Sequence, residues 1–182
     1  RTAYEWLRRL VGSEMCIRDS ANPVWAFGLR WLEQNMPPDS PLTVVHGDYR
    51  IGNVLVTEQG LNGILDWEFS HLGDPAEDVA WIAVRDWRFG NIHLPVGGIG
   101  TREAFLTAYY RAGGRQLEPA RLRWWEIAGN LKWAIFCLSQ ADRHLSGKEP
   151  NIEYAALGRR AAEMEWELLR LIEGENEWGS ET

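Results

Sequence analysis

Two carboxylates and a carboxamide stand close together in the sequence between Val45 and Glu68, and they could take part in one reaction. Asp48 follows a β-branched segment and a glycine, so a tight loop can expose its carboxylate. Asn53 comes five residues later, and Asp66 ends another short apolar segment thirteen residues after that. A hairpin between these segments would bring the three side chains together. A carboxylate base beside an amide oxygen and a second carboxylate suits proton removal next to an oxygen-ligated Mg²⁺.

Phosphoryl transfer uses this combination of groups. One Asp accepts the proton of the attacking hydroxyl, while an Asn and another Asp hold the metal ions that bridge the nucleotide phosphates. The interval of five residues from Asp48 to Asn53 also fits the catalytic-loop pattern of kinases. The alternative is that Asp and Asn here only form the turns of a hairpin. The ordered set of three residues favours the kinase-type site over that alternative.

Five spaced motifs extend the pattern over about thirty residues. In order along the chain they are His46-Gly47-Asp48, Asn53, Leu65-Asp66-Trp67-Glu68, Gly73-Asp74-Pro75 and Asp78. With these motifs the sequence resembles the aminoglycoside phosphotransferase and choline kinase-like family, within the protein-kinase-like fold. The similarity covers residues 21–172. It is greatest to bacterial phosphotransferase-family proteins, which are similar to the kinase-like domain fused to some acyl-CoA dehydrogenases.

The resemblance implies roles for particular residues. Asp48 would be the catalytic base, and Asn53 and Asp66 would bind Mg²⁺ and the phosphates of ATP. Glu68 would be a further metal ligand or would support one. Arg50 lies two residues after the base, where its guanidinium could stabilise charge that develops on the transferred phosphoryl group. The alternative for Arg50 is a solvated surface charge.

Other residues of the motifs are expected to have structural roles. His46 is expected to hydrogen-bond the loop and the segment around Asp66 rather than to carry a proton. Asp74 is expected to cap a helix, with Glu77 completing a capping box. Asp78 is expected to be buried and hydrogen-bonded to the catalytic loop.

Short strands and long helices are predicted to position these residues. β-Branched segments predict strands at 42–45, 53–57 and 63–66, with a turn at 59–63. Apolar periodicity and capping residues predict helices at 1–10, from Asn22-Pro23 to Pro37-Pro38, and at 75–88, 101–112, 118–145 and 151–173. The expected fold class is therefore α+β and mainly helical: a protein-kinase-like C-terminal lobe with a small β-hairpin platform.

The expected domain organisation has three parts: a truncated or non-native N-terminal segment (1–20), the phosphotransferase C-terminal lobe (21–173) and a polar tail (174–182). A whole kinase of this type also has an N-terminal lobe with a phosphate-covering loop and a lysine. Only residues 1–45 precede His46, and the two lysines, Lys132 and Lys148, lie downstream. We therefore expect an ATP- and Mg²⁺-dependent phosphotransferase that acts on a small-molecule hydroxyl, present as a fragment that is inactive alone.

Two other functions remain open at this stage. The first is a non-catalytic, pseudokinase-like binding module that keeps the acidic residues for structure. The second is metal-dependent phosphoester hydrolysis, which needs more metal ligands than the histidines provide, because His71, His93 and His144 show no ligand spacing.

The composition indicates which kinds of partner and which cellular location to expect. The formal net charge of −7 argues against a nucleic-acid partner, whose phosphates need a basic surface. No apolar run reaches the eighteen or so residues of a membrane span, and Cys16 and Cys137 form no disulfide framework, so a cytoplasmic protein is expected. The acceptor substrate, the preference for ATP over GTP and the oligomeric state are not determined by the sequence.

Overall fold

The computed structural model describes residues 2–11, 22–174 and 178 of the chain. The fold is mainly helical α+β, as predicted. The helices are α1 (Ala3–Val11), α2 (Pro23–Gln34), α3 (Ala76–Trp81), α4 (Arg102–Arg111), α5 (Pro119–Leu145) and α6 (Ile152–Glu173). The strands are β1 (Thr43–Val45), β2 (Val54–Thr57), β3 (Gly60–Ile64) and β4 (His71–Gly73). None of the helices in the described ranges has the length and apolar character needed to cross a membrane.

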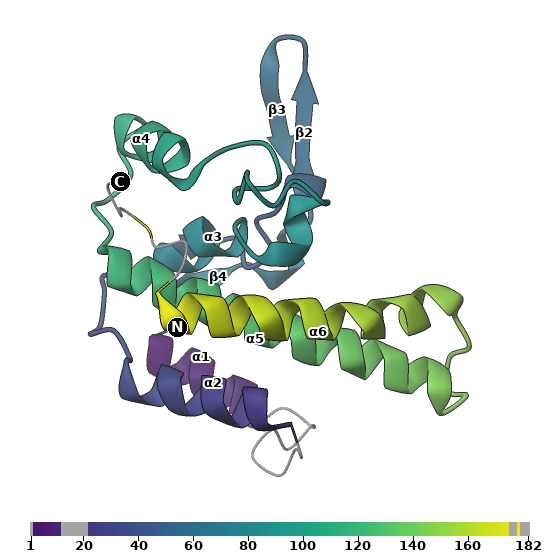
Figure 1. Cartoon of the computed structure of the whole chain (residues 1–182). Coiled ribbons are helices and arrows are strands. Elements are labelled where there is room, and N and C mark those ends of the chain that lie inside the picture. Colours follow the sequence, from purple (N-terminus) through teal and green to yellow (C-terminus); the bar gives the residue numbers. More distant parts are fainter. Residues whose placement is uncertain (1, 12–21, 175–177, 179–182) are drawn as a thin grey trace.

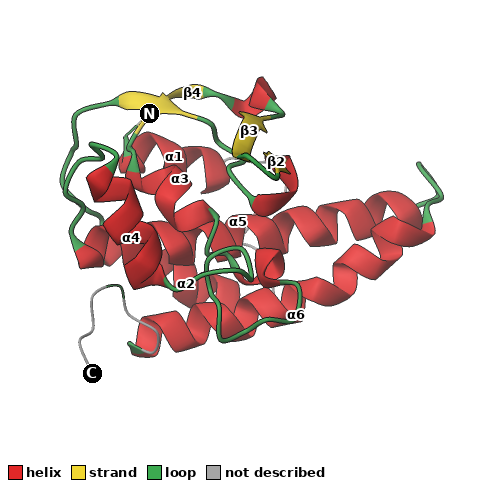
Figure 2. Ribbon diagram, turned by 90° about the horizontal axis from the view of Figure 1, so that it is seen from above, coloured by secondary structure: helices red, strands yellow, loops and turns green. Residues whose placement is uncertain are grey.

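A long antiparallel pair of helices, α5 and α6, forms the centre of the molecule. Figure 1 shows α1 and α2 along one side of this pair, and α3, α4 and the strands along the other. In the view from above, the far ends of α5 and α6 extend well beyond the other elements (Figure 2). The strands and the segments between them thus lie on one side of a helical base.

The core between these layers is rich in tryptophan. Trp6 of α1 contacts Trp124 and Trp125 of α5 edge to face, with ring centroids 6.1 and 5.5 Å apart. Leu32 of α2 and Leu168 of α6 are buried in the same cluster. Aromatic rings bury a large apolar area and pair favourably at these distances, so they account for much of the adhesion between the layers.

The strands form two separate antiparallel pairs rather than one hairpin platform. Strand β1 pairs with β4, so that Val45 lies opposite His71, and β2 pairs with β3, so that Val54 lies opposite Ile64. The sequence analysis missed β4, because three residues are too few to show an alternating pattern. The predicted third strand was placed too late: β3 begins at Gly60, which has a φ of 107°, and ends before Asp66.

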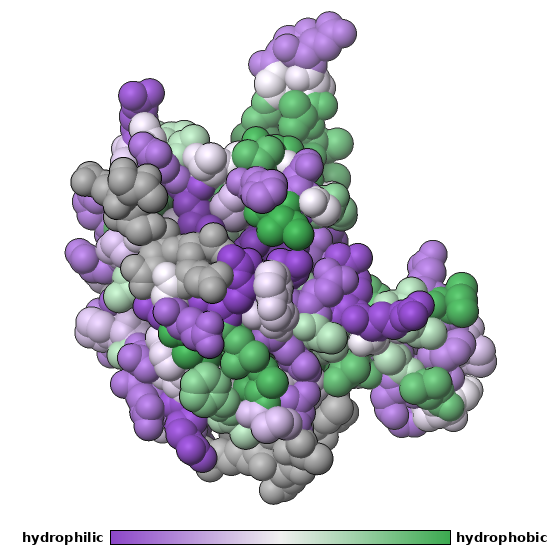
Figure 3. Space-filling model, in the orientation of Figure 1, coloured by the Kyte–Doolittle hydropathy of each residue, from purple (hydrophilic) through white to green (hydrophobic). Residues whose placement is uncertain are grey.

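The β2–β3 hairpin projects from the body of the molecule (Figure 1). Leu55, Val56 and Leu61 are exposed on it. The space-filling view shows apolar surface over the lower part of this hairpin and polar residues at its tip (Figure 3). The hairpin therefore presents apolar side chains to its surroundings.

Of the four helices predicted after Asp74, the last three agree with α4, α5 and α6 to within a residue or two. The predicted helix at 75–88 is divided into α3 and a 3₁₀ turn at Arg85–Arg88. Between α3 and this turn, two backbone groups form tertiary hydrogen bonds in place of helical ones. The Ile82 carbonyl accepts from the Gly97 N–H, and the Arg85 N–H donates to Asn130 Oδ1. The periodicity of the sequence continues through this break, so the sequence did not reveal it.

The two ends of the chain are only partly described. Of the predicted N-terminal segment, residues 2–11 belong to the described part and contain α1, whereas Cys16 lies outside it. The other cysteine, Cys137, is buried, and burial raises the pKa of its thiol to about 12. In the predicted polar tail, Trp178 is 1% exposed and belongs to the core.

Close packing of α3 against α5 depends on Gly129. A Cβ at this position would lie 2.9 Å from Val84 Cγ2 and 3.2 Å from the Trp81 ring. We expect Gly129→Val to lower the free energy of unfolding by about 1–3 kcal/mol, the usual cost of overpacking, although valine is the better helix former. Urea unfolding measures this loss. Ala156→Val on the exposed face of α6 is the matched control, and an equal effect of both changes would contradict the packing argument.

Candidate functional site

The loop between β1 and β2 is anchored to α3 by Asp78. Its carboxylate accepts from the backbone N–H of His46 at 2.6 Å and of Gly47 at 2.9 Å, as predicted. Gly47 has a φ of 83°, and a Cβ there would lie 2.6 Å from the Phe69 carbonyl oxygen, so the loop requires glycine. Burial raises the pKa of Asp78, although both backbone N–H groups act in the opposite direction. The loop is therefore fixed where it leaves β1.

His46 joins this loop to the segment that carries Asp66. Its ring is buried, Nε2 lies 2.8 Å from the Leu65 carbonyl oxygen, and Nδ1 accepts from the Asp48 N–H at 3.2 Å. Because an N–H group donates to Nδ1, the proton of the neutral ring lies on Nε2 and is donated to Leu65. Both nitrogens are thus engaged, which confirms the structural arrangement predicted for His46.

The Asp48 carboxylate is held by donors from three places. Oδ1 accepts from Trp81 Nε1 at 2.9 Å, and Oδ2 accepts from Asn53 Nδ2 at 2.8 Å and from Arg50 Nε at 3.1 Å. Its side chain is 14% exposed. The carboxylate is therefore oriented by the protein and still reachable from outside.

Trp81 is a site residue that the sequence analysis did not identify. It lies in α3 three residues after Asp78, and this spacing places both side chains on the same face of a helix. Because Asp78 is expected to contact the loop, this spacing could have indicated that Trp81 faces the loop as well. No role in the site was predicted for Trp81, which also packs in the core.

Asn53 lies beside Asp48 and leaves one oxygen for another ligand. The residue is 5% exposed, and its Nδ2 donates to both the backbone carbonyl and the carboxylate of Asp48. The remaining polar atom of the side chain, Oδ1, is an acceptor and can ligate a metal ion. Asn53 belongs to a 3₁₀ turn at Ile51–Asn53, not to the start of a strand as predicted.

Asp66 is placed next to Asn53 by the backbone of Leu65, whose N–H donates to the Asn53 carbonyl oxygen at 2.8 Å. Asp66 does not end a strand: it lies two residues after β3, with φ 66° and ψ 60°. This left-handed conformation costs free energy in a non-glycine residue, and such residues cluster at functional sites. The side chains of Asp66 and Glu68 are both exposed, and Glu68 lies in the 3₁₀ turn Trp67–Phe69.

Arg50 lies within the site, whereas the sequence also allowed it to be a solvated surface charge. In addition to its contact with Asp48, its guanidinium stacks over the Trp87 ring at 5.1 Å from the ring centre. Its side chain is 29% exposed. A cation–π contact and an ion pair together restrict the guanidinium to the neighbourhood of Asp48.

The oxygen atoms of the site suit Mg²⁺, which needs only one or two protein ligands, better than a metal ion whose ligands all come from protein side chains. Among the described residues, no group of three or more His, Cys, Asp or Glu side chains could hold a metal ion. Mg²⁺ usually binds through one or two protein ligands together with water and substrate phosphates. Asn53 Oδ1 and the exposed Asp66 carboxylate, from neighbouring segments, match this requirement.

A cavity of about 530 Å³ lies on another side of the same loop. Tyr49, Trp67 and Tyr109 provide aromatic rings for its wall, and His46 and Asp78 also line it. Burial and the nearby charge of Asp78 raise the pKa of Tyr49. Neither Asp48 nor Asn53 lines this cavity, so it does not contain the candidate reacting groups.

The family of the chain follows from comparison with known proteins. A model of the phosphotransferase enzyme family matches residues 2–125, which include the loop between β1 and β2 and both strand pairs. The chain belongs to the phosphotransferase enzyme family. The expected resemblance is confirmed.

Similar proteins include two acyl-CoA dehydrogenase relatives. Acyl-CoA dehydrogenase family member 11 of Gallus gallus is 29% identical over 161 residues, which cover 79% of this chain and 20% of that protein. The Arabidopsis thaliana protein named "Probable acyl-CoA dehydrogenase IBR3" is 26% identical over 191 residues, covering 95% of this chain and 22% of that protein. The chain thus spans about a fifth of the length of these curated relatives.

A solved structure shares the fold. It is a protein of Ralstonia eutropha that bears the provisional name aminoglycoside phosphotransferase. The two structures superpose with a TM-score of 0.73 at 22% identity, over 93% of this chain and 56% of the other. This similarity confirms the kinase-like fold predicted from the motifs.

The hydrogen bond from Trp81 to Asp48 can be measured by a double-mutant cycle. We expect Trp81→Phe and Asp48→Ala to show a coupling free energy of about 1 kcal/mol in urea unfolding, because the indole N–H donates to a partly exposed carboxylate. Trp87→Phe is the matched control, since the buried Trp87 Nε1 has no hydrogen-bond partner among the described residues. Equal coupling of both tryptophans to Asp48 would contradict this assignment.

The raised pKa of Asp78 predicts a pH dependence of stability. A carboxyl group whose pKa is higher in the folded than in the unfolded chain stabilises the fold while protonated, and this contribution is lost as pH rises through the folded-state value. The stability of the wild type relative to Asp78→Asn should therefore decrease as pH rises above 3.8, the ordinary pKa of an aspartate side chain. Chemical unfolding at a series of pH values measures this difference. A difference that increases over the same interval would show that the pKa is lowered.

Proposed function

We propose that this chain carries the catalytic and metal-binding half of an ATP- and Mg²⁺-dependent phosphotransferase that acts on the hydroxyl group of a small molecule. The observation that supports this most directly is the Asp48 carboxylate. It is oriented by Trp81, Asn53 and Arg50 and remains accessible. A general base needs this combination of fixed orientation and access to the substrate.

Asp48 is proposed to accept the hydroxyl proton through Oδ1. This oxygen accepts one hydrogen bond, from Trp81, whereas Oδ2 accepts two, from Asn53 and Arg50. A carboxylate oxygen has two lone pairs, so Oδ1 retains one for the incoming proton. As the proton moves to Asp48, the alcohol oxygen bonds to the γ-phosphorus and the bond from phosphorus to the leaving diphosphate breaks.

Asn53 and Asp66 are proposed to hold Mg²⁺ on the phosphates, with Glu68 as a further ligand or support. When bound, the ion would neutralise phosphate charge during transfer. Arg50 is close enough to Asp48 to stabilise negative charge on the phosphoryl oxygens beside the attacking alcohol. The exposed apolar residues of the β2–β3 hairpin, next to Asn53, offer a surface for the base of the nucleotide.

Efficient transfer also needs a loop over the phosphates and a lysine that contacts them. The described residues before β1 form helices α1 and α2, and Lys132 and Lys148 follow the catalytic loop by many residues. We therefore propose that these parts are supplied from outside the 182 residues. The chain by itself should bind nucleotide weakly and turn over little, because positioning of the phosphoryl group provides most of the catalysis.

The proposal is tested by substituting the base in a protein that joins this chain to a nucleotide-binding lobe. We expect Asp48→Asn to reduce acceptor-dependent ATP turnover by about 10²–10⁴-fold, the usual contribution of general base catalysis. Asp39→Asn, at an exposed position before β1, is the matched control and should have no effect. Formation of ADP from ATP is followed with a panel of small alcohols.

Further outcomes separate the alternatives. Asp66→Asn should raise the Mg²⁺ concentration needed for half-maximal turnover more than it changes the affinity for the alcohol. Wild-type turnover by Asp48→Asn would show that Asp48 is not the base. Nucleotide binding without Mg²⁺ dependence or turnover would favour a binding module, and phosphate release from an ester without acceptor would favour a hydrolase.

A further inference from the structure

The cavity of about 530 Å³ beside the loop between β1 and β2 takes no part in the proposed reaction, because neither Asp48 nor Asn53 lines it. Its wall comes from β1, the loop, the turn at Trp67–Phe69, α3 and α4. The volume lies within the usual range for small-molecule sites, which are largely formed before the ligand binds. The cavity therefore has the size of a second binding site.

Aromatic rings make up much of the wall. The centre of the His46 ring lies 4.7 Å from that of Trp67 and 6.3 Å from that of Tyr49. Phe105 and Tyr109 of α4 contribute two further rings. The Trp67 residue is 48% exposed, so part of its ring is free to contact a ligand. Aromatic molecules pair favourably with such rings, edge to face or offset.

The charged groups of the wall are already engaged within the protein. Both carboxylate oxygens of Asp78 accept from backbone N–H groups, and both ring nitrogens of His46 have partners. Arg115 is an exposed residue and donates to a backbone carbonyl. An ionic ligand would lose its hydration without gaining a free counter-charge inside the cavity, so the wall favours a neutral molecule.

The Tyr49 hydroxyl is a polar group that remains available to a ligand. Among the residues that the structure describes, none forms a hydrogen bond with this hydroxyl. Burial raises the pKa of Tyr49, so the hydroxyl keeps its proton at neutral pH. A phenol hydroxyl can donate one hydrogen bond and accept others, which suits a ligand with a single polar substituent.

We propose that this cavity binds a small, neutral aromatic molecule that carries one polar substituent. The aromatic body of the ligand contacts the rings of His46, Trp67 and Tyr109, and its substituent forms a hydrogen bond with the Tyr49 hydroxyl. The proposal does not rest on phosphoryl transfer, because it concerns residues that take no part in that reaction.

The ligand contacts residues that adjoin the Asp48 site. Tyr49 directly follows Asp48, and Trp67 directly follows Asp66. His46, whose ring joins the two segments, lines the same cavity. A ligand that binds only the folded arrangement stabilises it, so an occupied cavity holds the loop and the Asp66 segment together more firmly.

Binding is tested by calorimetric titration of the full chain with 2-naphthol, a neutral fused-ring compound with one hydroxyl group. We expect 2-naphthol to bind without nucleotide or Mg²⁺, so the result is independent of the proposed phosphotransferase function. Val44→Trp, on the cavity side of β1, should weaken binding by about tenfold or more, because the added ring takes space that the ligand needs. Val56→Trp on β2 is the matched control, since Val44 and Val56 are 65% and 66% exposed, and it should bind like the wild type.

A conservative variant tests the hydrogen bond. Tyr49→Phe keeps the ring and removes the hydroxyl, and it should weaken the binding of 2-naphthol by about fivefold, the usual effect of one neutral hydrogen bond. Hydrogen exchange of the backbone amides of Gly47 and Asp48 should slow when 2-naphthol is added to the wild type, and should not change in Val44→Trp.

Three results would overturn the proposal. The first is equal affinity of Val44→Trp and Val56→Trp for 2-naphthol. The second is the absence of binding up to the solubility limit of 2-naphthol. The third is binding of tetramethylammonium in its place, which would show a cation site. Binding of 2-naphthol without slower exchange of the loop amides would overturn the connection to the Asp48 site.

Discussion

The site depends on the two hydrogen bonds that the Asp78 carboxylate accepts from the backbone of His46 and Gly47. They attach the end of β1 to α3, which is itself packed closely against α5 at Gly129. The same helix carries the Trp81 indole that orients Asp48, so this attachment places the loop and the donor to its carboxylate together. The raised pKa of Asp78 indicates that the attachment is made at a cost in desolvation, which burial of the carboxylate imposes.

The loop is then connected to the Asp66 segment without a continuous sheet. His46 contacts the Leu65 carbonyl through its ring, and Asn53 accepts from the Leu65 N–H through its backbone. One contact uses the carbonyl of Leu65 and the other uses its N–H, so both backbone polar groups of Leu65 are fixed. The Asp66 carboxylate remains exposed. Because the β1–β4 and β2–β3 pairs are separate, the connections made by side chains and single peptide groups determine the geometry of the site.

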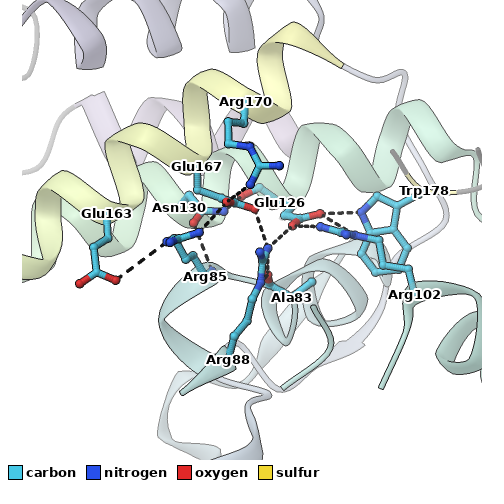
Figure 4. Close-up of polar contacts among 10 residues, drawn as sticks. All are labelled: Ala83, Arg85, Arg88, Arg102, Glu126, Asn130, Glu163, Glu167, Arg170 and Trp178. Carbon is cyan, nitrogen blue, oxygen red and sulfur yellow. Dashed lines mark hydrogen bonds and ion pairs between the residues drawn. The ribbon is translucent and has the colours of Figure 1, made fainter. Parts of the chain in front are cut away.

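Buried ion pairs of Arg88 with Glu126 of α5 and Glu167 of α6 join the segment after α3 to the two central helices (Figure 4). Buried ion pairs of this kind contribute little net stability, since the loss of hydration offsets most of the attraction. Their value lies in fixing side chains in one arrangement. Here they fix the segment 82–88 against α5 and α6, and through Trp87 they support the position of Arg50.

The sequence by itself determined the family, the helical character and which residues form the loop between β1 and β2. Motif spacing is a local property, and the capping residue Asn22 and the long periodic segments that became α5 and α6 are local too. Only the tertiary structure decided that Glu77 contacts His71 rather than completing a capping box with Asp74, although Asp74 does accept from the Ala76 N–H. It also decided the left-handed backbone of Asp66 and the contact of Trp81 with Asp48. These features depend on groups far apart in the chain competing for the same hydrogen bonds, and no local pattern records the outcome of that competition.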